Sequence, residues 1–565
     1  MARFDLIDEG WLPLRRKDGG TVVDVGIGEA LLDSHELTDL VVELPTQVPA
    51  LLRQVLLPIV MDALGAPADR ADWKRRFAAG RFSQVEVDRL GGYLDEHRAR
   101  FDLFSSSAPF AQVAGLEATN GETKGSGLIV PTEATGNNVP LFASRTESDA
   151  LPLTPAQAAR WLLHAHCWDT AAIKPGAKGD EAHVKAGKTT GNPTGPLGQL
   201  GLLVPMGPTL YETLLLNIPI SSRAQAGSPQ WRAAEPAQAG WEIRTPDGML
   251  DLWTWQARRI RLIPEPSPEG DRVVRIVLAA GDRVRTIPEW EPHTAWAFKK
   301  SAEKASAVDR RPRRHTSGKA IWRGLEALLA LERADGSAGG SVETSTLLVQ
   351  VGDLEAEGIL PDEYPLRVSA FGIVYGNQSA VIEDVYHDEI PLPVAGLRED
   401  ADTYGLLLGL VQQAEDLARA VNHLSGDLRR ATGLAPIPWD KAQRPGEQVL
   451  HALDSVVRRV LARIQTEQDW DVIQQGLLAW ELTAHRAARE IAEPLFAAVP
   501  ESVFAGRQLR RGTGEGASAW TYSLGTAEYN FRTRLNKILP AAADARREQA
   551  MSTSTDRADT VDTAT

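Results

Sequence analysis

The chain has 565 residues, more than one hydrophobic core usually organises, so two or more domains are expected. Its hydrophobic fraction of 43% and charged fraction of 24% are those of an ordinary soluble globular protein. The net charge of −14 argues against indiscriminate coating of nucleic acid, and the single Cys167 excludes an intramolecular disulfide framework and a multi-cysteine zinc site.

The amino terminus carries no export signal. Met1-Ala2-Arg3-Phe4-Asp5 opens directly into polar residues, and no uninterrupted apolar stretch is long enough to span a bilayer. The sequence therefore predicts a cytoplasmic protein with neither signal peptide nor membrane anchor.

Residues 1–395 mix strand-like and helical patterns with many glycines and prolines, which predicts a large mixed α/β domain. Apolar periodicity within it predicts helices at 53–64 and 156–167. Short apolar runs predict strands at 273–278 and 346–351.

A hairpin is predicted near the end of this domain. Residues 366–375 form one predicted strand and 380–386 its return, with Gly376-Asn377-Gln378-Ser379 between them. We expect the glycine and asparagine to provide the positive φ that short hairpin loops require. Such a turn presents two neutral amides, which suit base edges or backbone groups of a partner, although an ordinary surface turn has the same composition.

After Pro391-Leu392-Pro393 the pattern becomes helical. Four segments carry apolar residues at spacings of three or four, ending near residue 540. Four such stripes can bury themselves against one another, so residues 396–540 are predicted to form a four-helix bundle. The fold class is therefore α+β, a mixed α/β domain followed by an all-α bundle. Residues 541–565 are small, polar and threonine-rich, and are expected to be disordered.

Two segments could contact phosphate. Residues 299–323 contain nine basic and two acidic side chains, which is either a phosphate-binding patch or a solvated linker. Residues 174–201 contain seven glycines with Lys174, Lys178, Lys185 and Lys188, which is either a backbone-approach loop or a long surface loop.

Enzyme motifs are weak. Gly187-Lys188-Thr189 resembles the end of a phosphate loop, but Ala182 replaces the required glycine and a helical segment precedes it. His164, His166 and Cys167 lack the spacing of a metal site on one helix face, and no nucleophile elbow occurs.

The opening residues 4–13 (Phe-Asp-Leu-Ile-Asp-Glu-Gly-Trp-Leu-Pro) resemble the start of the large, CasA-type subunit of the type I-E Cascade complex, an RNA-guided CRISPR surveillance assembly. The resemblance continues at Pro109-Phe110 with Gln112, at 213–219, at 252–256 and at the Asn377-Gln378 turn, and covers nearly the whole chain. Each motif is short, but their order and spacing make the combination specific.

The resemblance implies a non-catalytic subunit without cofactor, which recognises the protospacer-adjacent motif in double-stranded DNA and seeds strand opening. The implied partners are target DNA, the 5′ end of the guide RNA, other Cascade subunits and a helicase–nuclease recruited after opening. The cysteine pairs of some relatives are missing, so no structural metal is expected.

The resemblance also implies roles for particular residues. The DNA wedge would be Asn377, Gln378 and Ser379, and the minor-groove glycine loop Gly176, Ala177, Lys178 and Gly179. DNA backbone or groove contacts would come from Lys299, Lys300 and either Arg283 or Arg285. The guide-RNA and motif loop would contain Asn137, Asn138, Phe142 and Ser144.

Two alternatives stay open at this point. One is an architectural subunit that touches only protein. The other is a nucleotide-dependent hydrolase built around Lys188.

Overall fold

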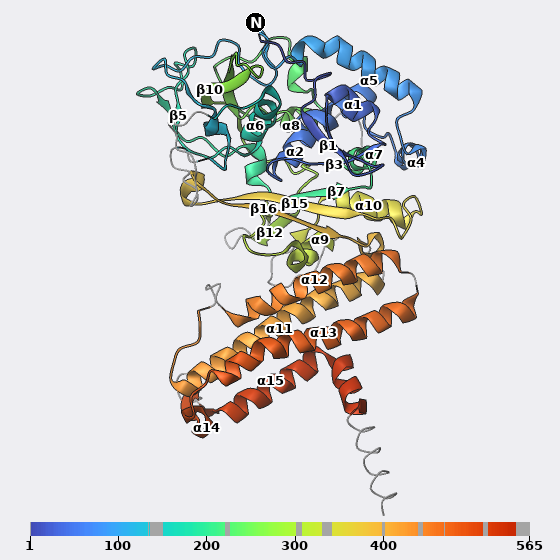
Figure 1. Ribbon diagram of the computed structural model, residues 1–565, viewed down its shortest axis with the longest axis vertical. Helices are drawn as coiled ribbons and strands as arrows, with labels where there is room; N and C mark the ends of the chain where they lie inside the picture. The colour runs from blue at the N-terminus through green and yellow to red at the C-terminus, as the bar shows by residue number, and fades with distance from the viewer. Residues whose placement is uncertain are drawn as a thin grey trace, which may run out of the picture. The chain divides into compact units, whose positions relative to one another are not determined.

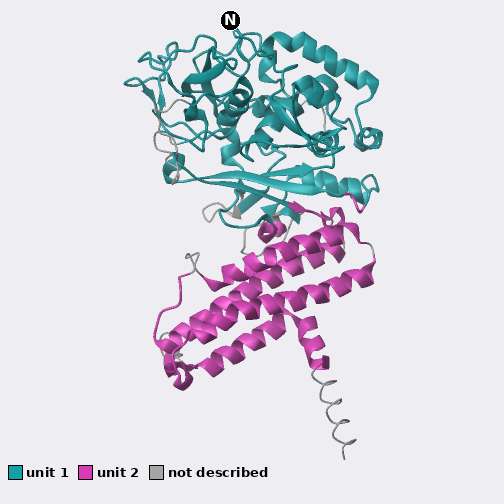
Figure 2. Ribbon diagram, in the orientation of Figure 1, with its two compact units in different colours: residues 1–321, 327–361, 365–389 teal, residues 322–326, 362–364, 390–565 magenta. Residues whose placement is uncertain are grey.

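The computed structural model describes residues 2–133, 135, 151–220, 226–300, 308–329, 342–397, 402–438, 444–467, 469–511 and 518–549 (Figure 1). The chain divides into two compact units (Figure 2). Unit 1 comprises residues 1–321, 327–361 and 365–389, and unit 2 comprises 322–326, 362–364 and 390–565. Mixed sheet and helix in the first and long helices in the second confirm the predicted fold class.

Unit 1 is built on small sheets rather than one large one. Its three-stranded sheets, each written with the central strand in the middle, are β2 (Val22–Val25), β1 (Leu12–Arg16), β3 (Leu37–Leu40); β4 (Lys124–Gly125), β10 (Arg272–Ala280), β9 (Arg258–Glu265); β13 (Val308–Pro312), β12 (Trp296–Lys300), β14 (Val342–Glu343); and β16 (Ile382–Pro391), β15 (Arg367–Tyr375), β7 (Leu202–Met206). Its two-stranded sheets are β5 (Lys174–Pro175) with β6 (Lys188–Thr189) and β8 (Ile243–Arg244) with β11 (Arg283–Val284).

Helices pack among these sheets. They are α1 (Ile27–Leu32), α2 (Gln47–Leu51), a π-helical turn (Leu52–Leu56), α3 (Leu57–Leu64), α4 (Arg70–Ala79), α5 (Gln84–His97), α6 (Pro155–Trp168), α7 (Leu210–Leu216), α8 (Met249–Trp253) and α10 (Thr346–Ala356). The short α9 (Leu325–Leu329) contains residues of both units.

The predicted helix at 53–64 belongs to a longer helical run that starts at Gln47 and crosses the π-helical turn. In the described parts of the chain, this run is the one helix that is long and apolar enough to cross a bilayer, with mean hydropathy 1.3. No such stretch was expected from the sequence. Of the residues in this run, 89% are buried inside the fold. Arg53 in its middle forms a buried ion pair with Glu291, with 2.6 Å between Nη1 and Oε1, as suits a core helix of a globular unit.

The predicted helix at 156–167 is confirmed as α6, which runs through the core of unit 1 and is buried from Ala158 to its end. Its start is fixed by a capping box, in which the Thr154 hydroxyl accepts from the Gln157 N–H and the Gln157 side chain accepts from the Thr154 N–H. Its last residue, Trp168, lies directly before the candidate site described below.

One predicted strand is wrong. Residues 346–351 open α10, whose N-cap Ser345 accepts a hydrogen bond from the Leu348 N–H. Leu347, Val351 and Leu354 are buried at helical spacing. A short apolar run cannot by itself distinguish a strand from a buried helix, and here the cap decides. The other predicted strand, 273–278, is confirmed within β10.

Unit 2 contains the four predicted long helices, α11 (Asp402–Thr432), α12 (Pro445–Thr466), α13 (Trp470–Ala497) and α15 (Leu524–Ile538). They lie side by side in Figure 1, and α11 contacts the other three. The predicted α11 stripe is buried at all of its positions: Leu407, Leu410, Ala414, Leu417, Val421 and Leu424. Burial of these stripes against one another accounts for the bundle.

Two features of unit 2 differ from the predictions. The unit is not all-α, because α14 (Ser502–Ala505) leads into a hairpin of β17 (Arg507–Arg511) and β18 (Ser518–Tyr522). Residues 541–549, expected to be disordered, are helical. Ala542 is buried there and its N–H donates to Glu481, which gives this segment tertiary contacts that its composition does not reveal.

Candidate nucleic-acid interface

The predicted hairpin is present, with β15 and β16 joined by a tight turn. The Gly376 N–H donates to the Val381 carbonyl at 2.9 Å and closes the ladder. Within the turn, the Ser379 N–H donates to Gly376 at 2.8 Å and the Ala380 N–H donates to Asn377 at 3.0 Å. These bonds fix the backbone of the turn in one conformation.

Left-handed backbone occurs at Gln378 and Ser379, with φ of 52° and 57°. The expectation that Gly376 and Asn377 supply the positive φ is wrong, since Gly376 has φ −80°. A side chain held in this region costs about 1–3 kcal/mol, which the surrounding hydrogen bonds must offset. Gln378 is therefore presented by a strained and well-determined turn rather than by a loose loop.

The amides of Asn377 and Gln378 are exposed, and neither side chain has a hydrogen-bond partner among the residues described. Ser379 is half-buried, and its carbonyl accepts a hydrogen bond from the Ala171 N–H at 2.8 Å. The turn is thus supported from behind while its two amides keep their donors and acceptors for a partner.

The turn end of the hairpin is fastened to the end of α6. The Tyr375 hydroxyl donates to the Trp168 carbonyl at 2.6 Å, and burial raises the pKa of this phenol. A Cβ at Gly198 would lie 2.4 Å from the same hydroxyl oxygen, so this glycine is required by close packing. The hairpin and the glycine-rich segment therefore meet at Tyr375.

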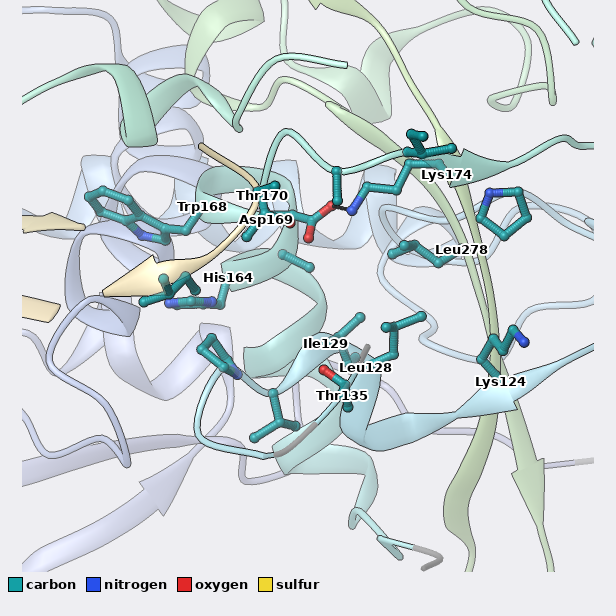
Figure 3. A pocket seen from close by; sticks show the side chains of 18 residues that line it. Lys124, Leu128, Ile129, Thr135, His164, Trp168, Asp169, Thr170, Lys174 and Leu278 are labelled. Atoms are coloured by element: carbon teal, nitrogen blue, oxygen red, sulfur yellow. Dashed lines mark ion pairs between the residues drawn. The ribbon is translucent and has the colours of Figure 1, made fainter. Parts of the chain in front are cut away.

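A buried ion cluster continues from α6 (Figure 3). Asp169 accepts from Lys174 at 2.6 Å and pairs with Arg258, whose guanidinium also donates to the carbonyls of Thr170 and Pro193. Burial alone would raise the pKa of Asp169, but the two cations outweigh it and hold that pKa at about 2. Burial lowers the pKa of Lys174. Lys174 is consequently part of the interior and is not a phosphate contact.

Two of the four residues of the predicted glycine loop are buried in the fold and two are exposed. Gly176 and Ala177 are buried, and a Cβ at Gly176 would come within 2.5 Å of Val184. The Ala177 methyl, expected against a minor groove, packs inside unit 1. Lys178 and Gly179 are exposed, and Lys178 forms an exposed ion pair with Glu117 at 2.5 Å.

Other glycines of the 174–201 segment serve packing as well. A Cβ at Gly195 would lie 2.2 Å from the Cys167 carbonyl, and one at Gly201 would lie 2.4 Å from the Arg313 carbonyl. Lys188 is exposed in the two-residue strand β6, and neither a preceding long strand nor a following α-helix forms a phosphate loop around it. This geometry disfavours the hydrolase alternative.

Arg283 and Arg285 differ in their contacts and in their exposure to solvent. Arg283 stacks on Trp241 at 3.9 Å and donates to the Thr190 carbonyl, and burial lowers its pKa. Trp241 also stacks on His183 at 4.0 Å. Arg285 is exposed and makes one hydrogen bond, to the Ile243 carbonyl. Arg285 is the member of the pair with an accessible guanidinium.

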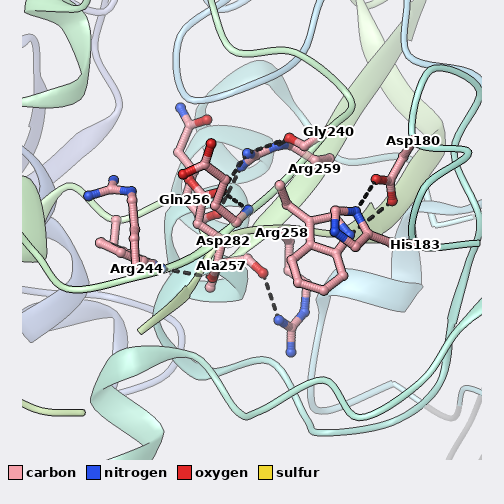
Figure 4. Close-up of polar contacts among 12 residues, drawn as sticks. Asp180, His183, Gly240, Arg244, Gln256, Ala257, Arg258, Arg259 and Asp282 are labelled. Atoms are coloured by element: carbon pink, nitrogen blue, oxygen red, sulfur yellow. Dashed lines mark hydrogen bonds and ion pairs between the residues drawn. The ribbon is translucent and has the colours of Figure 1, made fainter. Parts of the chain in front are cut away.

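The edge that carries Arg285 is held by polar contacts (Figure 4). Arg259 on β9 lies between Gly240 and Asp282, with 2.8 Å from Nη2 to each acceptor. Asp180 accepts from His183 at 2.6 Å and from Trp241 at 2.9 Å. These contacts fix the β8–β11 pair and connect it to the glycine-rich segment.

A pocket of about 250 Å³ lies where the hairpin and the glycine-rich segment meet residues 128–131 (Figure 3). Its lining includes Lys174 and Pro175 of β5, Ala380 and Ile382 of the hairpin, and residues 128–131. The predicted guide-RNA loop residues Asn137, Asn138, Phe142 and Ser144 lie outside the described residues. The pocket nevertheless brings the hairpin and the glycine-rich segment together with the stretch that precedes that loop.

The basic run at 299–323 is not one continuous patch. The backbone of Lys299 and Lys300 lies in β12, opposite Asp309 and Val308 of β13. Arg310 pairs with Glu343 at 2.8 Å and stacks on Trp296, so its charge is already compensated. Arg323 belongs to unit 2 and pairs with Glu415 and Glu447.

The helix α6 histidines have structural roles. His164 bonds the Thr46 hydroxyl and His166 the Ala111 carbonyl, and burial lowers their pKa values to about 3 and about 4. No group of three or more histidine, cysteine, aspartate or glutamate side chains suited to a metal ion occurs within the described ranges.

Sequence reasoning missed the contacts that position the turn. Asp169 stands two residues beyond the end of the predicted helix 156–167, and Arg258 comes directly before Arg259 and Ile260, so no local pattern marked these two residues as a pair. The Tyr375–Trp168 bond had no sequence signal, because it joins residues 207 positions apart.

The profile of the CRISPR-associated protein Cse1 family matches residues 5–491. The chain therefore belongs to this family, which confirms the resemblance to the large subunit of the type I-E Cascade complex. A relative named CRISPR-associated protein CasA/Cse1 from Thermus thermophilus is 30% identical over 512 residues, covering 86% of this chain and 93% of the relative.

Two solved structures show the same fold. Cse1 from Thermobifida fusca superposes with a TM-score of 0.80 at 31% identity, covering 96% of this chain and 99% of that one. A chain from a structure called "CRISPR RNA-guided surveillance complex" gives a TM-score of 0.66 at 21% identity, covering 95% of this chain and 100% of that one. The second likeness concerns the fold alone.

The Asp169 cluster gives a stability prediction. Asp169→Asn should lower the free energy of unfolding by about 3–5 kcal/mol, because it leaves two buried cations without a counter-charge. Adding Lys174→Met should recover part of this loss, so the two changes should be non-additive in urea unfolding of the full chain. Lys178→Met, which breaks an exposed pair, should cost at most about 1 kcal/mol.

The contribution of the same cluster to stability should depend on pH. The folded pKa of Asp169 lies below that of an unfolded aspartate, so its stabilisation is present above about pH 4 and is lost as pH falls towards 2. Equal urea midpoints for Asp169→Asn and the unmodified chain at pH 7 would contradict this account.

Proposed function

We propose that this chain is a non-catalytic subunit of an RNA-guided CRISPR surveillance complex that recognises the protospacer-adjacent motif in double-stranded DNA. In this proposal the turn 376–379 wedges into the duplex beside the motif and seeds strand opening. Membership in the Cse1 family supports the setting, and the exposed, left-handed amide turn carries the mechanism. The site supplies no group placed for covalent chemistry in this role.

The wedge works through shape and hydrogen bonding. Separating a base pair from its stack costs a few kcal/mol, so a wedge must be stiff enough to transmit binding energy from the flanking duplex. Gln378 and Asn377 are held by backbone hydrogen bonds on both sides of the turn. Their neutral amides can pair with freed base edges without the desolvation cost of a charge.

The flanking duplex would be held by cationic groups around the turn. Lys178 and Gly179 are the exposed members of the glycine loop, and Arg285 is the exposed arginine of β11 and its continuation. Lys299 and Lys300 would contact the DNA backbone, as the resemblance in sequence implies. Minor-groove reading distinguishes base pairs poorly, which suits tolerant recognition of a short motif.

The partners follow from the same assignment. Membership in the Cse1 family supports assembly with guide RNA and further subunits, and in this proposal the assembly is cytoplasmic. Residues 137–144 would contact the 5′ end of the guide RNA. Unit 2 would offer a face to the helicase–nuclease that acts once the duplex is open.

Removing the two amides tests the wedge. Asn377→Ala/Gln378→Ala, assembled with guide RNA and the other subunits, should open duplex targets at least about tenfold more slowly, because about 1.4 kcal/mol or more of transition-state support is lost. Permanganate reactivity of the unpaired thymines measures the opening rate. Gln84→Ala, which removes an exposed amide on α5, is the matched control.

A pre-opened target separates the alternatives. On DNA with a mismatched bubble beside the motif, the double variant should bind as tightly as the unmodified complex, since no stack remains to be broken. Normal opening of fully paired DNA by the double variant would exclude the wedge and favour the architectural, protein-only subunit. Failure of the variant to assemble would also support that architectural role.

The lysine pair should control affinity rather than opening. Lys299→Ala/Lys300→Ala should weaken DNA binding across all sequences and reduce the slope of log K against log salt by at most about two. Lys17→Ala/Lys74→Ala removes the same charge from exposed positions elsewhere in unit 1 and should leave the slope unchanged. A salt titration in which both variants have equal slopes would remove Lys299 and Lys300 from the DNA interface.

A further inference from the structure

A second pocket lies within unit 2, and none of its lining residues is assigned to the wedge. Its volume is about 310 Å³, at the lower end of the range typical of small-molecule sites. Its walls come from the second half of α11, the start of α12, helix α15 and strand β18. The three helices belong to the bundle in Figure 1.

The pocket is cationic. Arg430, Arg444 and Arg534 line it from three different helices or their flanks, against one carboxylate, that of Asp427. Arg430 pairs with Asp427 at 3.2 Å, and Arg534 adds a further guanidinium to the wall. His423 adds no charge near neutral pH, because burial and the nearby arginines lower its pKa.

One guanidinium in the wall is incompletely bonded. Nη1 of Arg534 is buried and has no hydrogen-bond partner within the described chain. Buried donors in folded proteins usually meet a ligand or an ordered water. Because Arg534 also lines the pocket, its guanidinium lies beside the space that an acceptor would enter.

Aromatic rings stand beside the arginines. Trp520 on β18 lines the pocket and is 40% exposed, which is unusual for the largest apolar side chain. Tyr522, also in the wall, carries Arg430 over its ring at 5.4 Å. An accessible indole next to guanidinium groups is the combination that stacks a base while pairing with its phosphate.

We infer that this pocket binds a nucleotide, with the phosphate ester on the guanidiniums of Arg534 and Arg430 and the base against Trp520. The shared chemistry is a phosphate ester with an attached base, which is offered both by a free nucleoside monophosphate and by a nucleic-acid strand. A plain carboxylate would satisfy the arginines but leave the indole unused. This inference does not depend on the wedge, because it concerns the purified chain without target DNA.

Isothermal titration of the full chain tests the site with four probes: AMP, inorganic phosphate, adenosine, and a short single-stranded oligothymidylate. AMP is expected to bind at least about fivefold more tightly than phosphate, and adenosine is expected to bind at least about fivefold more weakly than AMP. Tighter binding of the oligonucleotide than of AMP would identify a strand as the source of the phosphate ester. AMP binding equal to phosphate binding, or no binding of any probe at millimolar concentration, would overturn the inference.

Variants locate the site. Arg534→Met should weaken AMP about tenfold or more, as expected when a charged hydrogen bond is lost. Arg532→Met is the matched control, since Arg532 lies on the same helix, is 72% exposed and pairs with Glu528 at 2.6 Å. Trp520→Ala should bring AMP affinity down to that of phosphate and leave phosphate binding unchanged.

Folding of the variants is checked by their melting temperatures. Should Arg534→Met unfold the bundle, Asn530→Ala, one turn earlier in the same pocket wall, gives the second reading with an expected loss of AMP affinity. If folded Arg534→Met binds AMP as tightly as the control Arg532→Met, this pocket is ruled out. If Arg534→Met does not fold, the same comparison is made between Asn530→Ala and Arg532→Met.

Discussion

The carboxylate of Asp169, shared between Lys174 and Arg258, is the interaction on which the candidate interface depends. It joins the end of α6, strand β5 and strand β9 at one buried point. A buried charge without its partners costs several kcal/mol, so the register of these three segments is tightly specified. Ala171, whose N–H supports the turn of the hairpin, lies between the two pinned positions 169 and 174. The precision of the exposed turn is thus set by an ion cluster that is largely buried, with the Asp169 side chain 16% exposed.

This arrangement divides the cationic residues into two kinds. Lys174, Arg283 and Arg310 carry positive charges that the fold itself consumes, by ion pairing or by stacking on tryptophan. Lys178, in an exposed pair with Glu117, and Arg285 carry their charges at the surface. On a chain with net charge −14, contact with DNA has to come from such local groups, because the average field repels phosphate. Counting basic residues along the sequence overestimates the binding surface for this reason.

Much of the architecture was visible in the sequence. Helix α6, the hairpin and the buried stripe of α11 follow from local periodicity, which operates over a few residues. Predicting residues 346–351 as helix rather than strand required recognising the N-cap at Ser345. The helical residues 541–549 depend on contacts with Glu481. The two-residue strands exist because tertiary neighbours pair them, and no local pattern encodes that. Site residues were predicted only through the family resemblance, whereas their exposure and bracing came from three-dimensional contacts.

The position of the left-handed residues bears on how the turn would act. A glycine at 378 would relieve the backbone strain but would remove the amide and loosen the turn. The chain instead places glutamine there and serine beside it, at a cost that ordinary turn chemistry avoids. A surface turn without a task gains nothing from this choice, since its amides bond no described residue of the protein. A turn that must push a side chain between stacked bases gains stiffness, because the same hydrogen bonds that hold the strained φ also resist its displacement. The strained φ at two non-glycine residues is therefore consistent with a stiff turn, which is the property that the proposed wedge requires.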